Sequence, residues 1–185
     1  MTPAYPARHI FWMSNLSKKI AVVGLGNTLR RDDGIGIKVL EALLNFHRKS
    51  GVDYLDFGVT SIDLLNKIKD YDTVLLIDGI NAGDLRPGEL VIFELSDMGH
   101  SVNEATVSTH ELGLKDFFEL YVKFGMKTQV YVAGIQVQDV AHGERLSGPL
   151  GDSKDGIVRQ ISSFIEKLCD DKPSKIVQRG KRPAL

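Results

Sequence analysis

The chain is poor in several features that would each indicate a particular class of protein. Its 185 residues include a single cysteine, Cys169, so no disulfide can form within the chain and cysteine thiolates cannot build a metal cluster. No apolar run approaches the roughly 20 residues that a membrane-spanning helix requires. The first 19 residues contain too little apolar sequence for a signal peptide. We therefore expect a cytoplasmic protein that does not act at a membrane.

An excess of charge of one sign is also missing. Lysine and arginine total 23 against 24 aspartate and glutamate residues, which gives a formal net charge of −1. Proteins that bind nucleic acid usually carry a basic excess, so we expect no nucleic-acid partner. The sequence contains no Walker A motif, no Gly-x-Ser-x-Gly and no His-Glu-x-x-His. Because it also lacks a heptad pattern, we expect a monomer.

Short apolar segments rich in β-branched residues alternate with segments of helical spacing. The expected strands are 20–24, 52–57, 73–78, 89–94 and 129–137, and the expected helices are 37–44, 62–68, 112–121 and 157–168. This alternation predicts a single α/β domain, a doubly wound three-layer sandwich with a mainly parallel, mixed five-stranded sheet and helices on both faces. The strand at 89–94 follows its predecessor too closely for a parallel crossover of about a dozen residues, so we expect it to be antiparallel.

The segments outside these elements have the composition of loops and chain ends. We expect loops at 79–83 and 138–155, where glycines and polar residues gather. The predicted domain covers residues 19–170. Residues 1–18 are expected to form a flexible N-terminal extension, and residues 171–185 a flexible C-terminal tail.

The segment from Gly24 to Gly36 is the most informative part of the sequence. It follows a buried strand and precedes a helix, and it places two adjacent carboxylates, Asp32 and Asp33, among several glycines. In an open α/β sheet, ligands bind at the carboxyl ends of the strands, which is where this loop should lie. The segment is therefore the first candidate for chemistry.

Two further residues are predicted to reach the same edge of the sheet. Asp78 ends the clearest buried strand, and His110 opens the third expected helix. Carboxylate and imidazole together suit a borderline divalent metal such as nickel or zinc, and they suit acid/base catalysis equally well. Taken singly, each residue has a structural alternative, because acids commonly cap helices or form turns and a histidine can lie in a first helical turn. His100 and His142 lie in loops as secondary candidate ligands.

A dinucleotide site is disfavoured at the glycine segment. Gly24 and Gly26 provide two glycines, but the third position of the dinucleotide fingerprint is occupied by Leu29. Asp32 and Asp33 would also repel a pyrophosphate at the start of the helix.

The motifs closely resemble those of the hydrogenase maturation endopeptidases. The family opening is Gly-x-Gly-Asn followed by an acidic pair and Gly-x-Gly, and it stands here at 24–36. The family's second acid ends an apolar strand, as Asp78 does, and its histidine lies in a His-x-Leu-Gly-Leu segment, here 110–114. Segments 58–65 and 132–136 are also similar to the family. The resemblance spans roughly residues 19–168.

The resemblance implies an aspartic-type endopeptidase, in which nickel governs recognition of the substrate. Such an enzyme removes the C-terminal extension of a nickel–iron hydrogenase large-subunit precursor after nickel insertion. Asp33, Asp78 and His110 match the family's metal-contacting positions, and Asp33 and Asp78 are the candidate catalytic residues. The nickel is the substrate's own, carried by the precursor and not permanently bound by the protease. Two other functions remain open: a non-catalytic, nickel-dependent precursor-binding chaperone, and a general metal-dependent peptidase with its own zinc.

Overall fold

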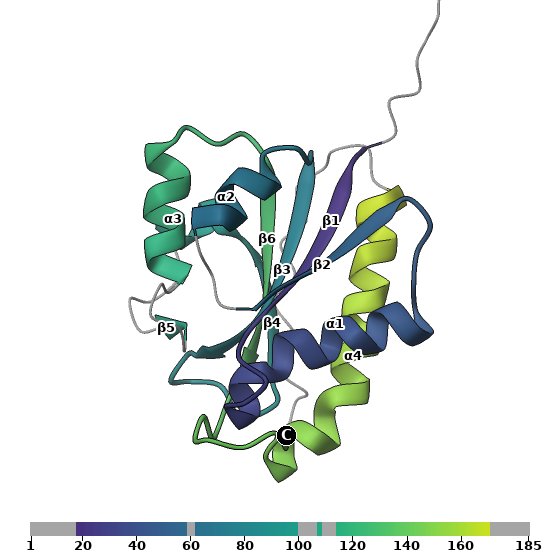
Figure 1. The fold of residues 1–185 in the computed structure, drawn as a ribbon, viewed down its shortest axis with the longest axis vertical. Helices are drawn as coiled ribbons and strands as arrows, with labels where there is room; N and C mark the ends of the chain where they lie inside the picture. The colour runs from purple at the N-terminus through teal and green to yellow at the C-terminus, as the bar shows by residue number, and fades with distance from the viewer. Residues whose placement is uncertain (1–17, 59–61, 100–106, 109–113, 171–185) are drawn as a thin grey trace, which may run out of the picture.

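The computed structural model describes residues 18–58, 62–99, 107–108 and 114–170 (Figure 1), and all structural statements concern these residues. The predicted N-terminal extension, except Lys18, and the predicted tail at 171–185 lie outside them.

A mixed sheet forms the centre of the molecule. Its strands are β1 (Ile20–Leu25), β2 (Val52–Gly58), β3 (Thr73–Asn81), β4 (Leu90–Glu94), β5 (Val107–Ser108) and β6 (Gln129–Gln136). Five of them follow the order β2-β1-β3-β6-β4. The pairs β1–β2, β1–β3 and β3–β6 are parallel, whereas β4 is antiparallel to β6. The mainly parallel five-stranded sheet and its antiparallel member are thereby confirmed, and the two-residue β5 adds an antiparallel pairing to β3.

Helices cover both faces of this sheet, as predicted. They are η1 (Arg31–Gly34), α1 (Ile35–Phe46), α2 (Ile62–Ile68), η2 (Leu95–Gly99), α3 (Leu114–Lys123) and α4 (Gly148–Asp170). Figure 1 shows α1 and α4 together on one side of the sheet and α2 and α3 on the other. Each pair packs its apolar residues against alternate side chains of the central strands, which gives two separate hydrophobic clusters. The three-layer sandwich follows from this arrangement.

Two predicted boundaries are wrong. Residues 79–81 were expected in a loop, but they continue β3, because they pair with β6 on one side and β5 on the other. Residues 148–155 were also expected in a loop, but α4 begins at Gly148. Pro149 lies in its first turn, where a missing N–H costs no helical hydrogen bond, so the proline begins this helix rather than breaking a longer one.

The strand order determines where a site can form. β1, β3 and β6 are neighbouring parallel strands, so their carboxyl ends meet at one edge of the sheet. β1 and β3 are adjacent, as the proposed meeting of Asp33 and Asp78 requires. Within the described residues, no helix combines the length and the apolar character needed to cross a bilayer.

Candidate active site

The glycines that follow β1 let the chain turn tightly at the edge of the sheet. Gly26 has a φ of 132°, and a Cβ at this position would lie 2.0 Å from the carbonyl oxygen of Asp33. A Cβ on Gly36 would lie 2.3 Å from the carbonyl oxygens of both Leu25 and Ile77. The first turn of α1 therefore packs directly on the backbones of β1 and β3. Only glycine permits this approach, which explains the Gly-x-Gly after the two acids.

Asp33 is held inside this tight turn. Its side chain is 2% exposed, and the backbone N–H of Asn27 donates to its Oδ2 at 3.2 Å. Its own backbone N–H donates to the carbonyl oxygen of Arg30 at 2.9 Å. The residue belongs to η1, the short helix between β1 and α1. The Asp33 carboxylate is thus positioned by the Gly-x-Gly-Asn segment itself.

Asp78 lies within β3 and not at its end, because the strand continues to Asn81. Its side chain is fully buried, and strand alternation places it on the same face as Leu76 and Ile80, toward α2 and α3. The next residue, Gly79, passes close to η1, since a Cβ there would lie 3.5 Å from the carbonyl oxygen of Asp32. The strand that carries Asp78 and the helix that carries Asp33 are therefore in contact.

His110, the third predicted ligand, lies outside the described residues, as does His100. The nearest described residue before His110 in the sequence is Ser108, which pairs with Ile80 on β3. Ile80 is two residues beyond Asp78. Among the described residues, no group of three histidine, cysteine, aspartate or glutamate side chains is arranged to hold a metal ion. The metal-ligand set therefore stays a prediction.

Asp32 has a role that its sequence position did not reveal. Its fully buried carboxylate accepts three backbone hydrogen bonds from the loop at 138–147, which joins β6 to α4. The donors are Gln138 at 3.1 Å and Asp139 at 2.9 Å to Oδ2, and Ser147 at 2.7 Å to Oδ1. Hydrogen bonds to an ionised acceptor are stronger than neutral ones. Of the two adjacent acids, Asp32 is thus the residue that anchors a distant loop.

Further contacts attach the same loop to the segment around Asp33. The backbone N–H of Arg31 donates to the carbonyl oxygen of Gly143 at 2.6 Å. The backbone N–H of Gly143 in turn donates to the carbonyl oxygen of Leu29 at 2.9 Å. Arg31, at a φ of 41°, also forms an ion pair with Asp139. The pKa of Asp139 is lowered, chiefly because its carboxylate accepts the backbone N–H of Ala141 and also because the Arg31 guanidinium lies beside it. The loop also carries His142, which is exposed.

Gln136 is a second polar residue whose role was not predicted. It is nearly buried at the carboxyl end of β6, and its Oε1 accepts the backbone N–H of Ala82 at 2.8 Å. Its Nε2 donates to the carbonyl oxygen of Val137 at 3.0 Å and to Oδ1 of Asn81 at 3.3 Å. Gln136 therefore fixes the chain where it leaves β3. A polar residue at the end of an apolar strand is the sequence signal that would have indicated it.

Comparisons with known proteins agree with this fold and these motifs. A family model described as hydrogenase maturation protease matches residues 37–164, which include Asp78 and His110 and begin four residues after Asp33. The hydrogenase expression/formation protein HupD of Bradyrhizobium diazoefficiens is 29% identical over 162 residues, 84% of this chain and 79% of HupD. HupM of Azotobacter chroococcum is 27% identical over 126 residues, 67% of this chain, and the aligned part spans 60% of HupM.

Solved structures show the same architecture. The hydrogenase maturation protease HycI from Thermococcus kodakarensis superposes with a TM-score of 0.64 at 26% identity, over 82% of this chain and 95% of HycI. The hydrogenase maturating endopeptidase HybD from Escherichia coli gives a TM-score of 0.67 at 22% identity, over 81% of this chain and 93% of HybD.

The fold is thus the one found in solved hydrogenase maturation endopeptidases. Because the family model covers more than half of its residues, the chain belongs to the hydrogenase maturation protease family. This confirms the resemblance inferred from the glycine–acid and histidine motifs. It also confirms the predicted enzyme class, since a maturation protease is a hydrolase.

Proposed function

We propose that this protein is an endopeptidase that removes the C-terminal extension of a nickel–iron hydrogenase large-subunit precursor once nickel has been inserted. Family membership supports the reaction class. The placement of two buried carboxylates supports the site, because Asp33 follows β1 and Asp78 lies on the adjacent β3, one residue beyond Ile77, which pairs with Gly24 near the end of β1. We expect the protein to act as a monomer in the cytoplasm.

The nickel of the precursor serves as the recognition handle in this proposal. Asp33, Asp78 and His110 supply carboxylate oxygen and imidazole nitrogen, a donor set that suits a borderline metal already held by other ligands of the substrate. The pairing of Ser108 with Ile80 supports the inclusion of His110, because it brings the chain to β3 two residues before that histidine. Affinity then depends on nickel, so the precursor is cut only after it is loaded.

Hydrolysis requires a water molecule to attack the scissile carbonyl carbon. The C–N bond then breaks, and one proton from the water ends on the leaving amine. Asp33 or Asp78 can accept that proton as general base and pass it to the amine. Alternatively, the substrate's nickel polarises the carbonyl or the water while the two carboxylates hold the metal. In both cases the bound metal fixes the position of the scissile bond relative to the carboxylates, which lowers the barrier.

A processing assay tests the proposal. The purified full chain is mixed with a nickel–iron hydrogenase large-subunit precursor, with and without nickel, and the products are read by intact mass. We expect loss of a C-terminal peptide from the nickel-loaded precursor alone. A stable complex without cleavage would instead indicate a binding chaperone. Stoichiometric zinc in the purified protein, together with cleavage of the nickel-free precursor, would indicate a peptidase with its own metal.

A further inference from the structure

Beside the site, a groove of about 290 Å³ opens between the loop after β1 and the end of β2. Its walls are residues 26–29, Ile37 on α1, and Asp56 and Gly58 on β2. The groove adjoins the candidate catalytic centre, because Asn27 in its wall donates its backbone N–H to the Asp33 carboxylate. A chain bound in the groove would therefore lie next to Asp33.

Leu29 stands out in this wall because it is an apolar residue that the fold does not bury. It is 61% exposed, although it lies three residues before the fully buried Asp32. Its backbone is nevertheless fixed on both sides. Its N–H donates to Oδ1 of Asn27 at 3.0 Å, and its carbonyl oxygen accepts the N–H of Gly143 at 2.9 Å. The exposed side chain is thus presented by a rigid backbone.

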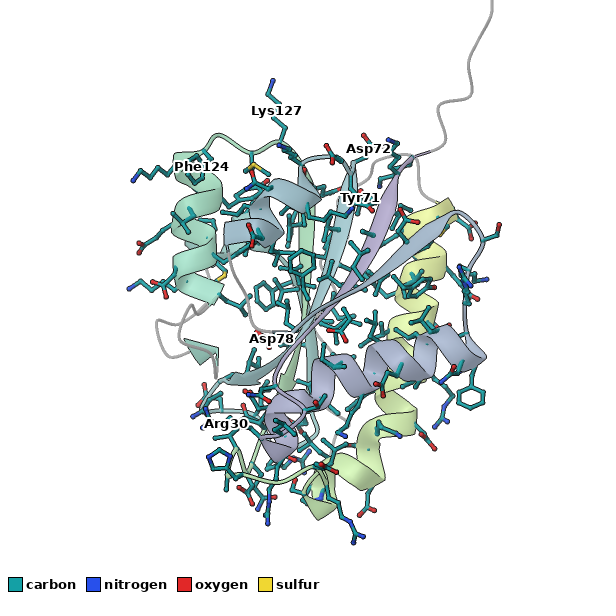
Figure 2. All side chains as sticks on the ribbon, viewed as in Figure 1. Arg30, Tyr71, Asp72, Asp78, Phe124 and Lys127 are labelled. Atoms are coloured by element: carbon teal, nitrogen blue, oxygen red, sulfur yellow. The ribbon has the colours of Figure 1, made fainter. Side chains whose placement is uncertain are left out.

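A rigid, exposed apolar side chain is well suited to binding a partner. Contact with it removes apolar surface from water, and its backbone has no conformational freedom left to lose. The Asp32 carboxylate contributes to this rigidity, because it anchors the loop that contains Gly143. The comparably exposed Phe124 follows α3 and, in Figure 2, lies at the opposite end of the molecule from Arg30, the neighbour of Leu29.

We propose that Leu29 and the groove beside it bind the segment of the hydrogenase precursor that flanks the scissile peptide bond. The proposal rests on the proposed function, since that function makes the precursor the substrate. The groove lies beside Asp33, which identifies the part of the precursor that it binds. The substrate segment nearest to the reacting carboxylate is the one that contains the bond to be cut. Leu29 is then a specificity-determining residue, and an apolar side chain of the precursor packs on Leu29.

The test compares Leu29→Ala with Leu29→Met and with Phe124→Ala as a matched, exposed apolar control. We expect Leu29→Ala to raise KM for the nickel-loaded precursor about tenfold, the loss expected when most of a buried leucine contact is removed. The value of kcat should stay within about twofold, because uniform binding has been lost rather than transition-state stabilisation. Leu29→Met should restore KM, and Phe124→Ala should leave it unchanged. The melting temperature of Leu29→Ala should match that of the wild type, which separates a binding role from a structural one.

An unchanged KM in Leu29→Ala, while the wild type cleaves normally, would overturn the groove proposal and leave the proposed function intact. An equal rise in KM in Phe124→Ala would overturn it as well. If the wild type leaves the precursor uncut, the proposed function fails, and the same variants are compared by their Kd for the precursor. A Kd about tenfold higher in Leu29→Ala alone would then support the groove, whereas an unchanged Kd, or no binding by the wild type, would refute it.

Discussion

Replacement of Asp32 by asparagine tests whether this buried acid anchors the loop at 138–147. Asparagine has nearly the same shape, but it exchanges one carboxylate oxygen for an NH2 group. If its remaining oxygen accepts from Gln138 and Asp139, the NH2 faces the N–H of Ser147, and two donors meet without an acceptor. If the amide is turned the other way, its NH2 faces Gln138 and Asp139, and two backbone N–H groups are left without an acceptor instead of one.

The expected cost follows from these three contacts. A hydrogen bond to a charged group contributes about 1.5–3 kcal/mol, and a neutral one about 0.5–1.5 kcal/mol. The substitution removes one of the three bonds and weakens the other two, because their acceptor is no longer charged. Removal of a buried charge offsets part of this loss. We therefore expect a net destabilisation of about 2–4 kcal/mol, which for a chain of this size corresponds to a melting temperature lower by about 4–16 °C.

Thermal unfolding of the full chain, followed by circular dichroism, measures this effect. Asp155→Asn is the matched control, because it makes the same chemical change at an exposed position on α4, outside the anchored loop. Hydrogen exchange should also speed up at the amides of Gln138, Asp139 and Ser147 in Asp32→Asn. A melting temperature within about 2 °C of the wild type, or an equal decrease in Asp155→Asn, would refute the assignment of Asp32 as an anchor.

Three further predictions concern the site, the glycine motif and the opposite end of the sheet. Asp33→Asn and Asp78→Asn should each abolish processing of the nickel-loaded precursor while circular dichroism shows a folded protein; normal cleavage by either variant removes that residue from the site. Gly36→Ala should lose about 3 kcal/mol or more, because its Cβ would lie 2.3 Å from two carbonyl oxygens. Gly156→Ala, inside α4 with only the Arg159 side chain at 4.0 Å, should gain about 0.5–1 kcal/mol. Urea titration of both variants measures these changes in the free energy of unfolding, and similar results for the two would contradict the close approach of α1 to the sheet. Tyr71 lies at the end of the sheet opposite Arg30 (Figure 2), and burial, together with its hydrogen bond to Asp53 at 2.9 Å, raises its pKa to about 12. The folded state therefore keeps a proton that the unfolded chain releases near pH 10. The free energy of unfolding consequently falls as the pH rises from 10 to 12, and Tyr71→Phe should show a shallower fall over that window. Parallel curves of stability against pH for the two proteins would show that Tyr71 does not contribute.

The sheet and its helices were predictable because their signals are local. The apolar runs that became β1 and β3 are buried on both faces, so they contain almost no polar residues and stand out in the sequence. The short spacing before β4 predicted its antiparallel direction for a simple steric reason, since a parallel return needs a longer connection.

The boundaries that were wrong depend on contacts far along the chain. Residues 79–81 look like a loop because of Gly79, and only their pairing with β5 and β6 makes them strand. A Cβ on Gly79 would lie 2.8 Å from the side chain of Val137, so the residue that suggests a turn is required by packing instead. The start of α4 was missed because Pro149 is a turn signal inside a chain but is equally suitable for the first turn of a helix.

The sequence by itself determined the family, the order of the elements and the positions of the acids, because motifs and hydrophobic periodicity are properties of neighbouring residues. Only the tertiary structure distinguished Asp32 from Asp33 by their contacts. These adjacent, almost fully buried acids differ in their partners, because Asp32 binds amides more than 100 residues away, whereas Asp33 is bound by the amide of Asn27 in its own loop. The tertiary structure also left Leu29 exposed beside Asp33. Both outcomes depend on how the loop at 138–147 folds back over the end of β1, and no local pattern encodes that contact.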